Sequence, residues 1–211
     1  HYHANVIHNL STSTFAWLDE RQPSGYDIHM NNGLRYEKEL ADLFGVSNAG
    51  GSDTVPDLMI NGVGIEVKST LGAAFGSVSL THKSGVWDIT TRVRSKVLAT
   101  AVRKSPILQR INDEWISSTD VHQQVVVSID SRIARQYYRS KECAYLQIKT
   151  HGLFRLGRLN PWNLEVPMFN PKKVTLRARR NAPKGGGRTA NFICIDCSNS
   201  QHSSMNLEEL A

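Results

Sequence analysis

The chain has few cysteines, no long apolar segment and no internal repeat. Its three cysteines are too few, and odd in number, for a disulfide scaffold, which favours a reducing compartment. No stretch approaches the roughly 20 apolar residues that a membrane span needs. No secretory signal is visible, and we expect a cytoplasmic protein that does not contact a membrane.

Charge is distributed unevenly along the 211 residues. Residues 1–131 hold 11 Lys and Arg against 14 Asp and Glu, whereas residues 132–211 hold 14 against 5. The length and a hydrophobic content of 40% predict one domain over residues 1–211. We expect a core at about residues 30–130 and a basic elaboration at about residues 131–200, which a polyanion would contact.

The segment from Pro56 to Lys68 is the most informative in the chain. Asn61-Gly62 between alternating apolar residues is a strong hairpin signal. A two-residue turn there pairs Leu58 with Ile65 and brings Asp57 opposite Glu66. The apolar face of this hairpin is expected to join the core. That face carries Leu58, Ile60, Val63, Ile65 and Val67, and the other carries Asp57, Met59, Gly64, Glu66 and Lys68.

Asp57 and Glu66 are two carboxylates that this pairing places roughly 5 Å apart, where they repel. A cation between them would relieve the repulsion, and magnesium binds through one or two carboxylates plus substrate phosphate. Lys68 lies one step further along the same face. The alternative is an ordinary amphipathic hairpin with a solvated polar face.

Residues 33–45 are predicted to form a helix that Gly45 ends. Glu37 falls within its apolar stripe, whereas Glu39 lies outside and is expected to be solvated. An inward carboxylate needs a partner, which the metal site would supply. The alternative is a Glu37 at the edge of the stripe, paired with Arg35 or Lys38. The stripe consists of Leu34, Leu40, Ala41 and Phe44.

Further along, the pattern predicts a strand at 76–81, a helix from Trp87 to Val102 broken by Pro106, and a helix at 107–116. Residues 121–130 fit either a strand or the start of a helix running to Tyr138. Short strands are expected at 144–149 and 151–156, and a hairpin at 173–180 and 188–195.

Two motifs in the last third admit alternatives. Cys194-x-x-Cys197, with His202 beyond it, suggests zinc, but a second ligand pair is missing, and residues 192–195 fit a buried strand. The glycine-rich loop at 181–188 contains Lys184 and Arg188 and suits phosphate contact, unless it is simply a hairpin tip.

Pro56-Asp57 followed by Glu66-x-Lys68 resembles the signature of the PD-(D/E)XK nuclease superfamily. Further blocks at 64–70, 84–87, 91–98 and 145–149 follow in the order found in MutH and its type II restriction relatives. The resemblance covers roughly residues 37–177. It implies an α/β (α+β) fold with a restriction-endonuclease-like core, in which helices flank a mixed central sheet, plus a basic β-rich C-terminal part. It also suggests a prokaryotic or phage origin.

The resemblance assigns roles by position. Asp57 and Glu66, with the Val67 carbonyl, would hold Mg²⁺, for which Mn²⁺ would substitute. Glu37 would match a helix carboxylate near the metal. Lys68 would activate or orient the attacking water, and Lys96 would be a further basic residue of the active site. The expected DNA-binding residues are Lys149, Arg155, Arg177, Arg179, Arg180, Lys184 and Arg188.

The chain departs from the family pattern at two DNA-contacting positions. Thr175 stands where the family has a recognition tyrosine, and Lys149 stands where it has an arginine, which loses bidentate geometry. Lys96 and Lys149 have the alternative of being ordinary surface lysines.

The favoured function is a Mg²⁺-dependent, sequence-specific endonuclease of double-stranded DNA, of the type II restriction class, acting as a homodimer if it cuts both strands. Two alternatives keep nuclease chemistry. One is a strand-nicking mismatch-repair enzyme, and the other is a Holliday-junction resolvase, suggested by Gly51-Ser52 ahead of Pro56-Asp57. A third is a non-catalytic DNA-binding module.

Overall fold

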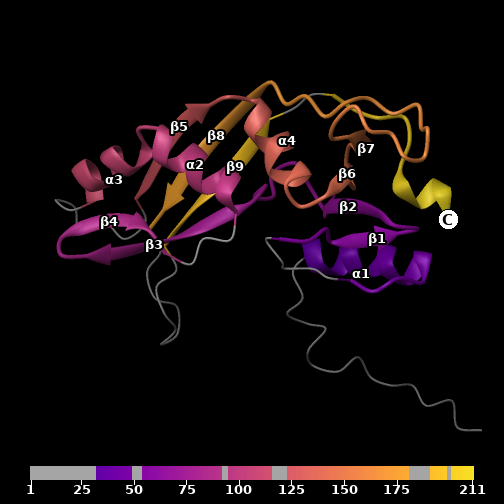
Figure 1. Cartoon of the computed structure of the whole chain (residues 1–211), viewed down its shortest axis with the longest axis horizontal. Helices are drawn as coiled ribbons and strands as arrows, with labels where there is room; N and C mark the ends of the chain where they lie inside the picture. The colour runs from indigo at the N-terminus through magenta and orange to yellow at the C-terminus, as the bar shows by residue number, and fades with distance from the viewer. Residues whose placement is uncertain (1–31, 49–53, 92–94, 116–122, 181–190, 199–200) are drawn as a thin grey trace, which may run out of the picture. The chain divides into compact units, whose positions relative to one another are not determined.

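The chain folds as a mixed α+β protein, in which the described residues form two β-sheets and four α-helices (Figure 1). The computed structural model describes residues 32–48, 54–91, 95–115, 123–180, 191–198 and 201–211. Residues 31–211 belong to one compact unit. None of the described helices is long and apolar enough to cross a membrane.

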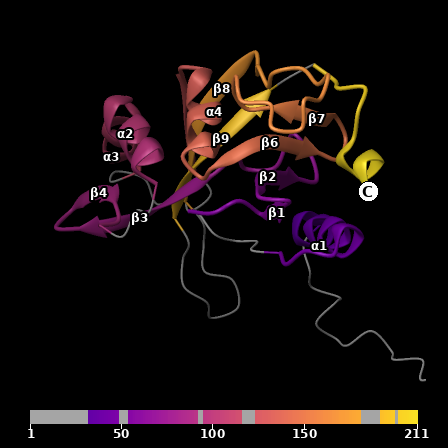
Figure 2. The same cartoon turned by 45° about the vertical axis from the view of Figure 1, so that its right-hand side comes forward.

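The first sheet has four strands in the order β1-β2-β6-β7. These are β1 (Leu58–Ile60), β2 (Val63–Lys68), β6 (Cys143–Ile148) and β7 (Gly152–Arg155). β2 and β6 run parallel and lie side by side (Figure 2), whereas the other two pairs are antiparallel. Helix α1 (Asn32–Phe44) contacts β1 and β2. The sheet is therefore mixed, and its central parallel pair joins distant parts of the sequence.

The second sheet has five antiparallel strands in the order β4-β3-β9-β8-β5. The strands are β3 (Ser77–Lys83), β4 (Val86–Ile89), β5 (Gln124–Ile129), β8 (Lys173–Arg179) and β9 (Phe192–Ser198). Helices α2 (Lys96–Lys104) and α3 (Ile107–Trp115) contact this sheet, and α4 (Arg132–Arg139) contacts α2 and β6. Both sheets combine strands from before and after residue 131.

The predicted hairpin around Asn61-Gly62 is confirmed. Leu58 pairs with Ile65, and Ile60 pairs with Val63. Both turn residues have positive φ, 49° and 76°, as a type I′ turn requires. The predicted apolar face joins a core cluster with Tyr36, Leu40 and Tyr145. The turn chemistry and the alternation therefore fix which side chains of β2 face α1.

Helix α1 begins one residue earlier than predicted and ends at Phe44, followed by Gly45 at a φ of 63°. Its inward face contains Tyr36, Glu37, Leu40 and Ala41, so the prediction that Glu37 points inward is confirmed. The placement of Leu34 on this face was wrong, since Leu34 is 38% exposed. Tyr36 is buried on this face instead, and its hydroxyl donates a hydrogen bond to Glu208.

The helix predicted from Trp87 to Val102 was wrong over its first part. Residues Val86–Ile89 form strand β4, paired with β3 across Ser84-Gly85, whose positive φ angles of 49° and 79° make a second tight turn. Trp87 and Ile89 are buried in alternation, which is a strand period. Helix α2 begins only at Lys96, capped by Ser95, whose side chain accepts a hydrogen bond from the Leu98 amide. Residues 92–94 lie outside the described residues.

The remaining predicted elements have mostly the expected type. The helix predicted at 107–116 is α3, and the strands predicted at 76–81, 144–149 and 151–156 are β3, β6 and β7. The hairpin strands predicted at 173–180 and 188–195 are β8 and β9. The described part of the ambiguous segment contains β5 and most of α4, separated by Asp130 and Ser131.

Two apolar clusters form the core. The smaller lies between α1 and the first sheet, and the larger joins the second sheet, α2, α3 and α4 with β6 and β7. Glu66 pairs with Leu146 and Lys68 with Ile148 in the parallel ladder, so these four side chains share one face. Leu146 and Ile148 belong to the larger cluster. Around Asp57 and Glu66, the polar side of the hairpin therefore faces the interior, whereas Met59 on the same side is exposed.

Candidate functional site

Two carboxylates lie buried at the start of the first sheet. Asp57 is 4% exposed and Glu66 is 3% exposed. The Asp57 Oδ2 atom accepts a hydrogen bond of 2.9 Å from the Val67 amide, which attaches the residue before β1 to the middle of β2. Both carboxylates of the hairpin therefore lie where water has little access.

Two lysines neutralise this pair. The Lys68 ammonium lies 2.5 Å from Glu66 Oε1 and 3.8 Å from Asp57 Oδ2. The Lys141 ammonium lies 2.6 Å from Glu66 Oε2 and 3.9 Å from Asp57 Oδ1. Each oxygen of each carboxylate therefore has an ammonium within 4 Å. We call these four residues the carboxylate–lysine cluster.

Burial and charge act in opposite directions in the cluster. Burial raises the pKa of Asp57, and the neighbouring Glu66 carboxylate adds to this effect while Lys68 and Lys141 oppose it. Burial by itself lowers the pKa of Lys68, but the Glu66 and Asp57 carboxylates outweigh burial and raise it. The two lysines thus offset part of the effect that burial has on the pKa of Asp57.

Glu37 approaches the same cluster from helix α1. It is 7% exposed, and burial followed by the charge of Asp57 raises its pKa to about 7. Its Oε2 atom is buried and has no hydrogen-bond partner among the described residues. The alternative pairing with Arg35 is not found, because Arg35 lies against Glu39 at 3.6 Å. Glu37 is therefore a buried acid with an acceptor atom to spare, near ionised groups.

The aromatic ring of Tyr138 covers the cluster from helix α4. The Lys68 and Lys141 ammonium groups lie 5.8 Å and 5.9 Å from its ring centroid. The ring of Tyr137 lies 6.0 Å from Lys141. Cation–π contact of this kind stabilises a desolvated ammonium. The Cys143 thiol lies 4.0 Å from Glu66 Oε2, and burial raises its pKa.

The donor chemistry of the cluster fits a hard divalent cation. Asp57 and Glu66 supply carboxylate oxygens, and the unpartnered Glu37 oxygen is a third acceptor in their electrostatic range. As the side chains stand, no three His, Cys, Asp or Glu residues in the described part of the chain converge on one ion position. Ammonium groups hold the carboxylate oxygens instead, so an ion would have to displace at least one of them.

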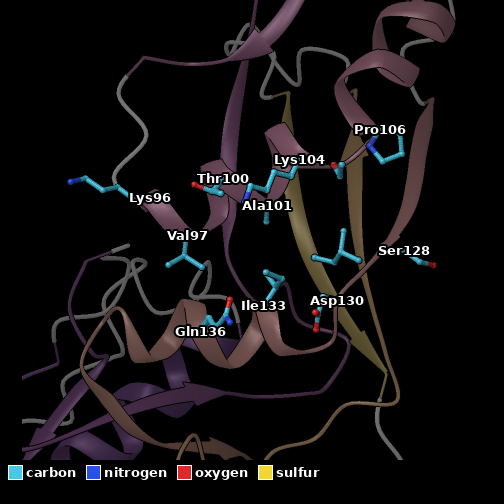
Figure 3. A pocket seen from close by; sticks show the side chains of 12 residues that line it. Lys96, Val97, Thr100, Ala101, Lys104, Pro106, Ser128, Asp130, Ile133 and Gln136 are labelled. Atoms are coloured by element: carbon cyan, nitrogen blue, oxygen red, sulfur yellow. The ribbon is translucent and has the colours of Figure 1, made fainter.

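Lys96 is not placed with the cluster. It is exposed at the first residue of α2 and lines a cavity of about 620 Å³ between α2, β5 and α4. In Figure 3, Val97 and Ala101 of α2 face Ile133 and Gln136 of α4 across this cavity. None of Asp57, Glu66 and Lys68 lines it.

Arg177 and Arg179 lie on the same face of β8 in the second sheet. Arg177 forms a bidentate ion pair with Asp196 on the neighbouring strand, through Nε to Oδ2 and Nη2 to Oδ1. Arg179 pairs in register with Phe192 and Gln124. Arg180 donates to the Trp115 carbonyl and lies 5.9 Å from the Trp87 ring. Lys184 and Arg188 lie outside the described residues.

Lys149 and Arg155 lie at the first sheet and not at the second. The Lys149 ammonium lies 3.1 Å from Glu39 and 4.6 Å from the Tyr36 ring centroid, which places it beside α1 rather than on the second sheet. Arg155 donates to the Val166 carbonyl. The seven expected DNA-binding residues therefore do not form one patch among those that are described.

The two cysteines of the Cys194-x-x-Cys197 motif lie on strand β9, as the buried-strand alternative predicted. A spacing of three residues places them on opposite faces of that strand. His202 stacks on His151 with ring centroids 4.5 Å apart. These positions keep the three side chains from sharing one ligand sphere.

Sequence reasoning missed Lys141. It lies in the polar run Arg139-Ser140-Lys141-Glu142, which looks like a solvated turn. The one available signal was the order helix-then-strand around it, which is typical of a crossover to a parallel strand. Because residues 121–130 fit either a strand or a helix, that order is not evident from the sequence pattern.

No family model, curated protein or solved structure matches this chain.

Proposed function

We propose that the protein is a Mg²⁺-dependent endonuclease that hydrolyses phosphodiester bonds in double-stranded DNA. The observation that carries the proposal is the pair of buried carboxylates, Asp57 just before β1 and Glu66 on β2, bridged by the Lys68 ammonium. The three residues resemble the acidic pair plus lysine of the PD-(D/E)XK signature, and their proximity supports the proposal.

The energetic argument supports a functional cluster. Burying an ion pair costs desolvation that the Coulomb attraction barely offsets, so apolar side chains of the same size would serve the fold equally well. Clusters of desolvated charge are therefore retained most often at sites that use them. Asp57 and Glu66 lie at the open end of a rigid hairpin, away from the Asn61-Gly62 turn, which also suits a site that holds its groups in fixed geometry.

In the proposed mechanism, Asp57 and Glu66 would hold the ion with the Val67 carbonyl, and Glu37 would add an acceptor oxygen. When bound, a divalent ion lowers the pKa of bound water and offsets charge on the phosphate. Lys68 donates hydrogen bonds to the attacking water and to the phosphate oxygens, where negative charge develops. Tyr138 excludes bulk water from one side of these groups, which strengthens each interaction.

The finer fold assignment is a restriction-endonuclease-like core. The mixed first sheet with α1 and α4 beside it supports this assignment, because it carries the acidic hairpin at its parallel centre. DNA would be contacted by the basic C-terminal part of the chain. Arg177 and Arg179 on β8, next to the 181–190 segment, are the proposed contacts to phosphates or base edges.

Within this class, a type II restriction enzyme acting as a homodimer is the favoured assignment, because the chain offers a large basic part beyond the acidic hairpin for contacting sequence. A second candidate from a different class is a DNA-binding module without catalysis. It is favoured by Lys141, which completes the neutralisation of Glu66 with no metal at all.

The test uses phage DNA, supercoiled plasmid and four-way junctions, incubated with the protein in Mg²⁺ or in EDTA. Glu66→Gln removes the central carboxylate, and Glu165→Gln makes the same change at an exposed position as the matched control. A restriction enzyme is supported if wild type and Glu165→Gln give discrete fragments in Mg²⁺ but not in EDTA, and Glu66→Gln gives none.

Other outcomes separate the candidates. Nicked plasmid without double-strand cuts indicates a nicking enzyme, and selective junction cleavage indicates a resolvase. DNA binding without cleavage of any substrate, with equal behaviour of all three proteins, contradicts the catalytic proposal and supports the binding module.

A further inference from the structure

Lys141 is a buried ammonium that the PD-(D/E)XK signature does not include. It lies in the turn between α4 and β6, where its amide donates to the Tyr138 carbonyl at 3.0 Å. The next residue, Glu142, has a positive φ of 63°, and its amide donates to the Arg139 carbonyl. The backbone that carries Lys141 is thus fixed by two turn hydrogen bonds.

The two lysines of the cluster occupy nearly equivalent positions. Their distances to Glu66 are 2.5 Å and 2.6 Å, and their distances to Asp57 are 3.8 Å and 3.9 Å. They bind opposite oxygens of each carboxylate, Lys68 on Glu66 Oε1 and Lys141 on Glu66 Oε2. As point charges they therefore have almost the same effect on the acidic pair.

They differ in how tightly the protein encloses them. The Lys141 side chain is 3% exposed, whereas that of Lys68 is 15% exposed. Lys141 lies near the rings of both Tyr137 and Tyr138, and Lys68 near Tyr138. A ligand arriving from solvent thus has access to Lys68 before Lys141.

The hairpin packs directly against the turn that carries Lys141. A Cβ on Gly64 would lie 2.5 Å from the Glu142 carbonyl oxygen and 2.6 Å from Pro56 Cγ. Gly64 pairs with Cys143 at the start of the parallel ladder, beside a register shift. The turn that carries Lys141 is thus packed closely against β2 at backbone level, whereas the Lys68 side chain extends from the last residue of β2.

We infer that Lys141 is a positioning residue that holds Glu66 through Oε2, while Lys68 is the displaceable lysine that leaves Glu66 when a divalent cation binds. This inference rests on the proposed function. Glu66 then offers Oε1 to the ion, and the released Lys68 ammonium is free to contact substrate phosphate. Lys141 and Lys68 carry the same charge but differ in role, because Lys141 is enclosed and Lys68 borders solvent.

The first test compares Mn²⁺ binding without DNA by wild type, Lys68→Met and Lys141→Met, with free Mn²⁺ followed by electron paramagnetic resonance. Each variant removes one positive charge at the same distance from the carboxylates, so the pair is matched electrostatically. Lys68→Met is expected to bind Mn²⁺ roughly 10-fold more tightly than wild type, because a competing cation is gone.

Lys141→Met is expected to bind at least about 10-fold more weakly than Lys68→Met, because Glu66 loses its orientation as well as a charge. Affinities of the two variants within about threefold of each other would overturn the inference and make Lys141 a plain counter-charge. Circular dichroism confirms that each variant is folded.

A second test is made on the wild-type protein, and a variant serves only to assign its signals. In wild-type protein with ¹⁵N-labelled lysines, the hydrogen-bonded ammonium groups of Lys68 and Lys141 are expected to give slowly exchanging signals, assigned with Lys68→Arg. Saturating Mg²⁺ is expected to abolish the Lys68 signal and retain that of Lys141. Loss of the Lys141 signal instead would overturn the inference.

The two proposals fail in different ways. If wild type binds neither Mn²⁺ nor Mg²⁺, the proposed function fails and the inference fails with it. If metal binds and DNA is cut but the two lysines respond alike, only the inference fails.

Discussion

The two sheets carry charge in different places. In the first sheet, Glu66 and Lys141 are each 3% exposed, and their ion pair lies against apolar side chains of the larger core cluster. In the second sheet, Arg177 and Asp196 form an ion pair whose side chains are 20% and 26% exposed. The chemistry of the two pairs is similar, but only the first is removed from water.

The two ion pairs therefore differ in the desolvation cost of keeping them in the folded state. A partly exposed pair contributes at most about 1 kcal/mol and costs little to keep. A buried pair barely repays its own desolvation, yet the loss of one partner leaves an uncompensated charge. The first sheet is therefore where a functional explanation is required.

The largest effect is expected from breaking the buried pair on one side. Lys141→Met leaves Glu66 without its Oε2 partner, and we expect it to lower the free energy of unfolding by about 3–5 kcal/mol. Arg177→Met at the second sheet should lower it by about 1 kcal/mol or less. Urea denaturation of both variants checks the contrast, and equal losses at the two positions would contradict it.

Removing both partners should recover part of the loss. In a double-mutant cycle, Lys141→Met combined with Glu66→Gln is expected to show a coupling free energy of about 2–3 kcal/mol. The corresponding cycle with Arg177→Met and Asp196→Asn should show less than about 1 kcal/mol. The account fails here if the first coupling is no larger than the second.

The close contact between the hairpin and the Lys141 turn gives a smaller effect. Gly64→Ala places a methyl group against the Glu142 backbone and Pro56, and should destabilise the protein by about 2 kcal/mol. Gly62→Ala, in the same hairpin, meets open space but has a positive φ of 76°, so about 1 kcal/mol is expected. Thermal unfolding distinguishes them, and a Gly64→Ala variant as stable as wild type would rule out the tight packing.

The smallest effect concerns pH. The folded-state pKa of Glu37, about 7, lies above its ordinary value of 4.5, so its contribution to stability is fully present below pH 4.5 and is lost as the pH rises through 7. Glu37→Gln removes this dependence. The variant should match wild type near pH 4 and exceed it by about 1–2 kcal/mol at pH 8. If the free energies of unfolding of the two proteins differed by the same amount at every pH in this range, the raised pKa of Glu37 would be contradicted.

The parts of the molecule that follow from local chemistry were predictable. Asn61-Gly62 determines its own turn and hence the register that brings Asp57 and Glu66 together on the hairpin. Gly45 ends its helix for a similar local reason. The inward direction of Glu37 followed from the helical period alone.

The parts that depend on distant pairing were not predictable. The helix-then-strand order around Lys141 does not identify β2 as the parallel partner of β6, and only that pairing brings Lys141 to Glu66. Trp87 was assigned to a helix because Val93 and Val97 continue a helical spacing, whereas its pairing with β3 requires the Ser84-Gly85 turn. The expected place of Lys96 came from resemblance, and the structure puts it beside another cavity.

The most direct measurement is the rate at which supercoiled plasmid is lost when Mg²⁺ is added to wild type and to Glu66→Gln, with Glu165→Gln as control. The account predicts cleavage by wild type and the control, none in EDTA, and a rate at least about 100-fold lower for Glu66→Gln. Equal rates for all three proteins, or no cleavage by wild type despite tight DNA binding, would contradict it.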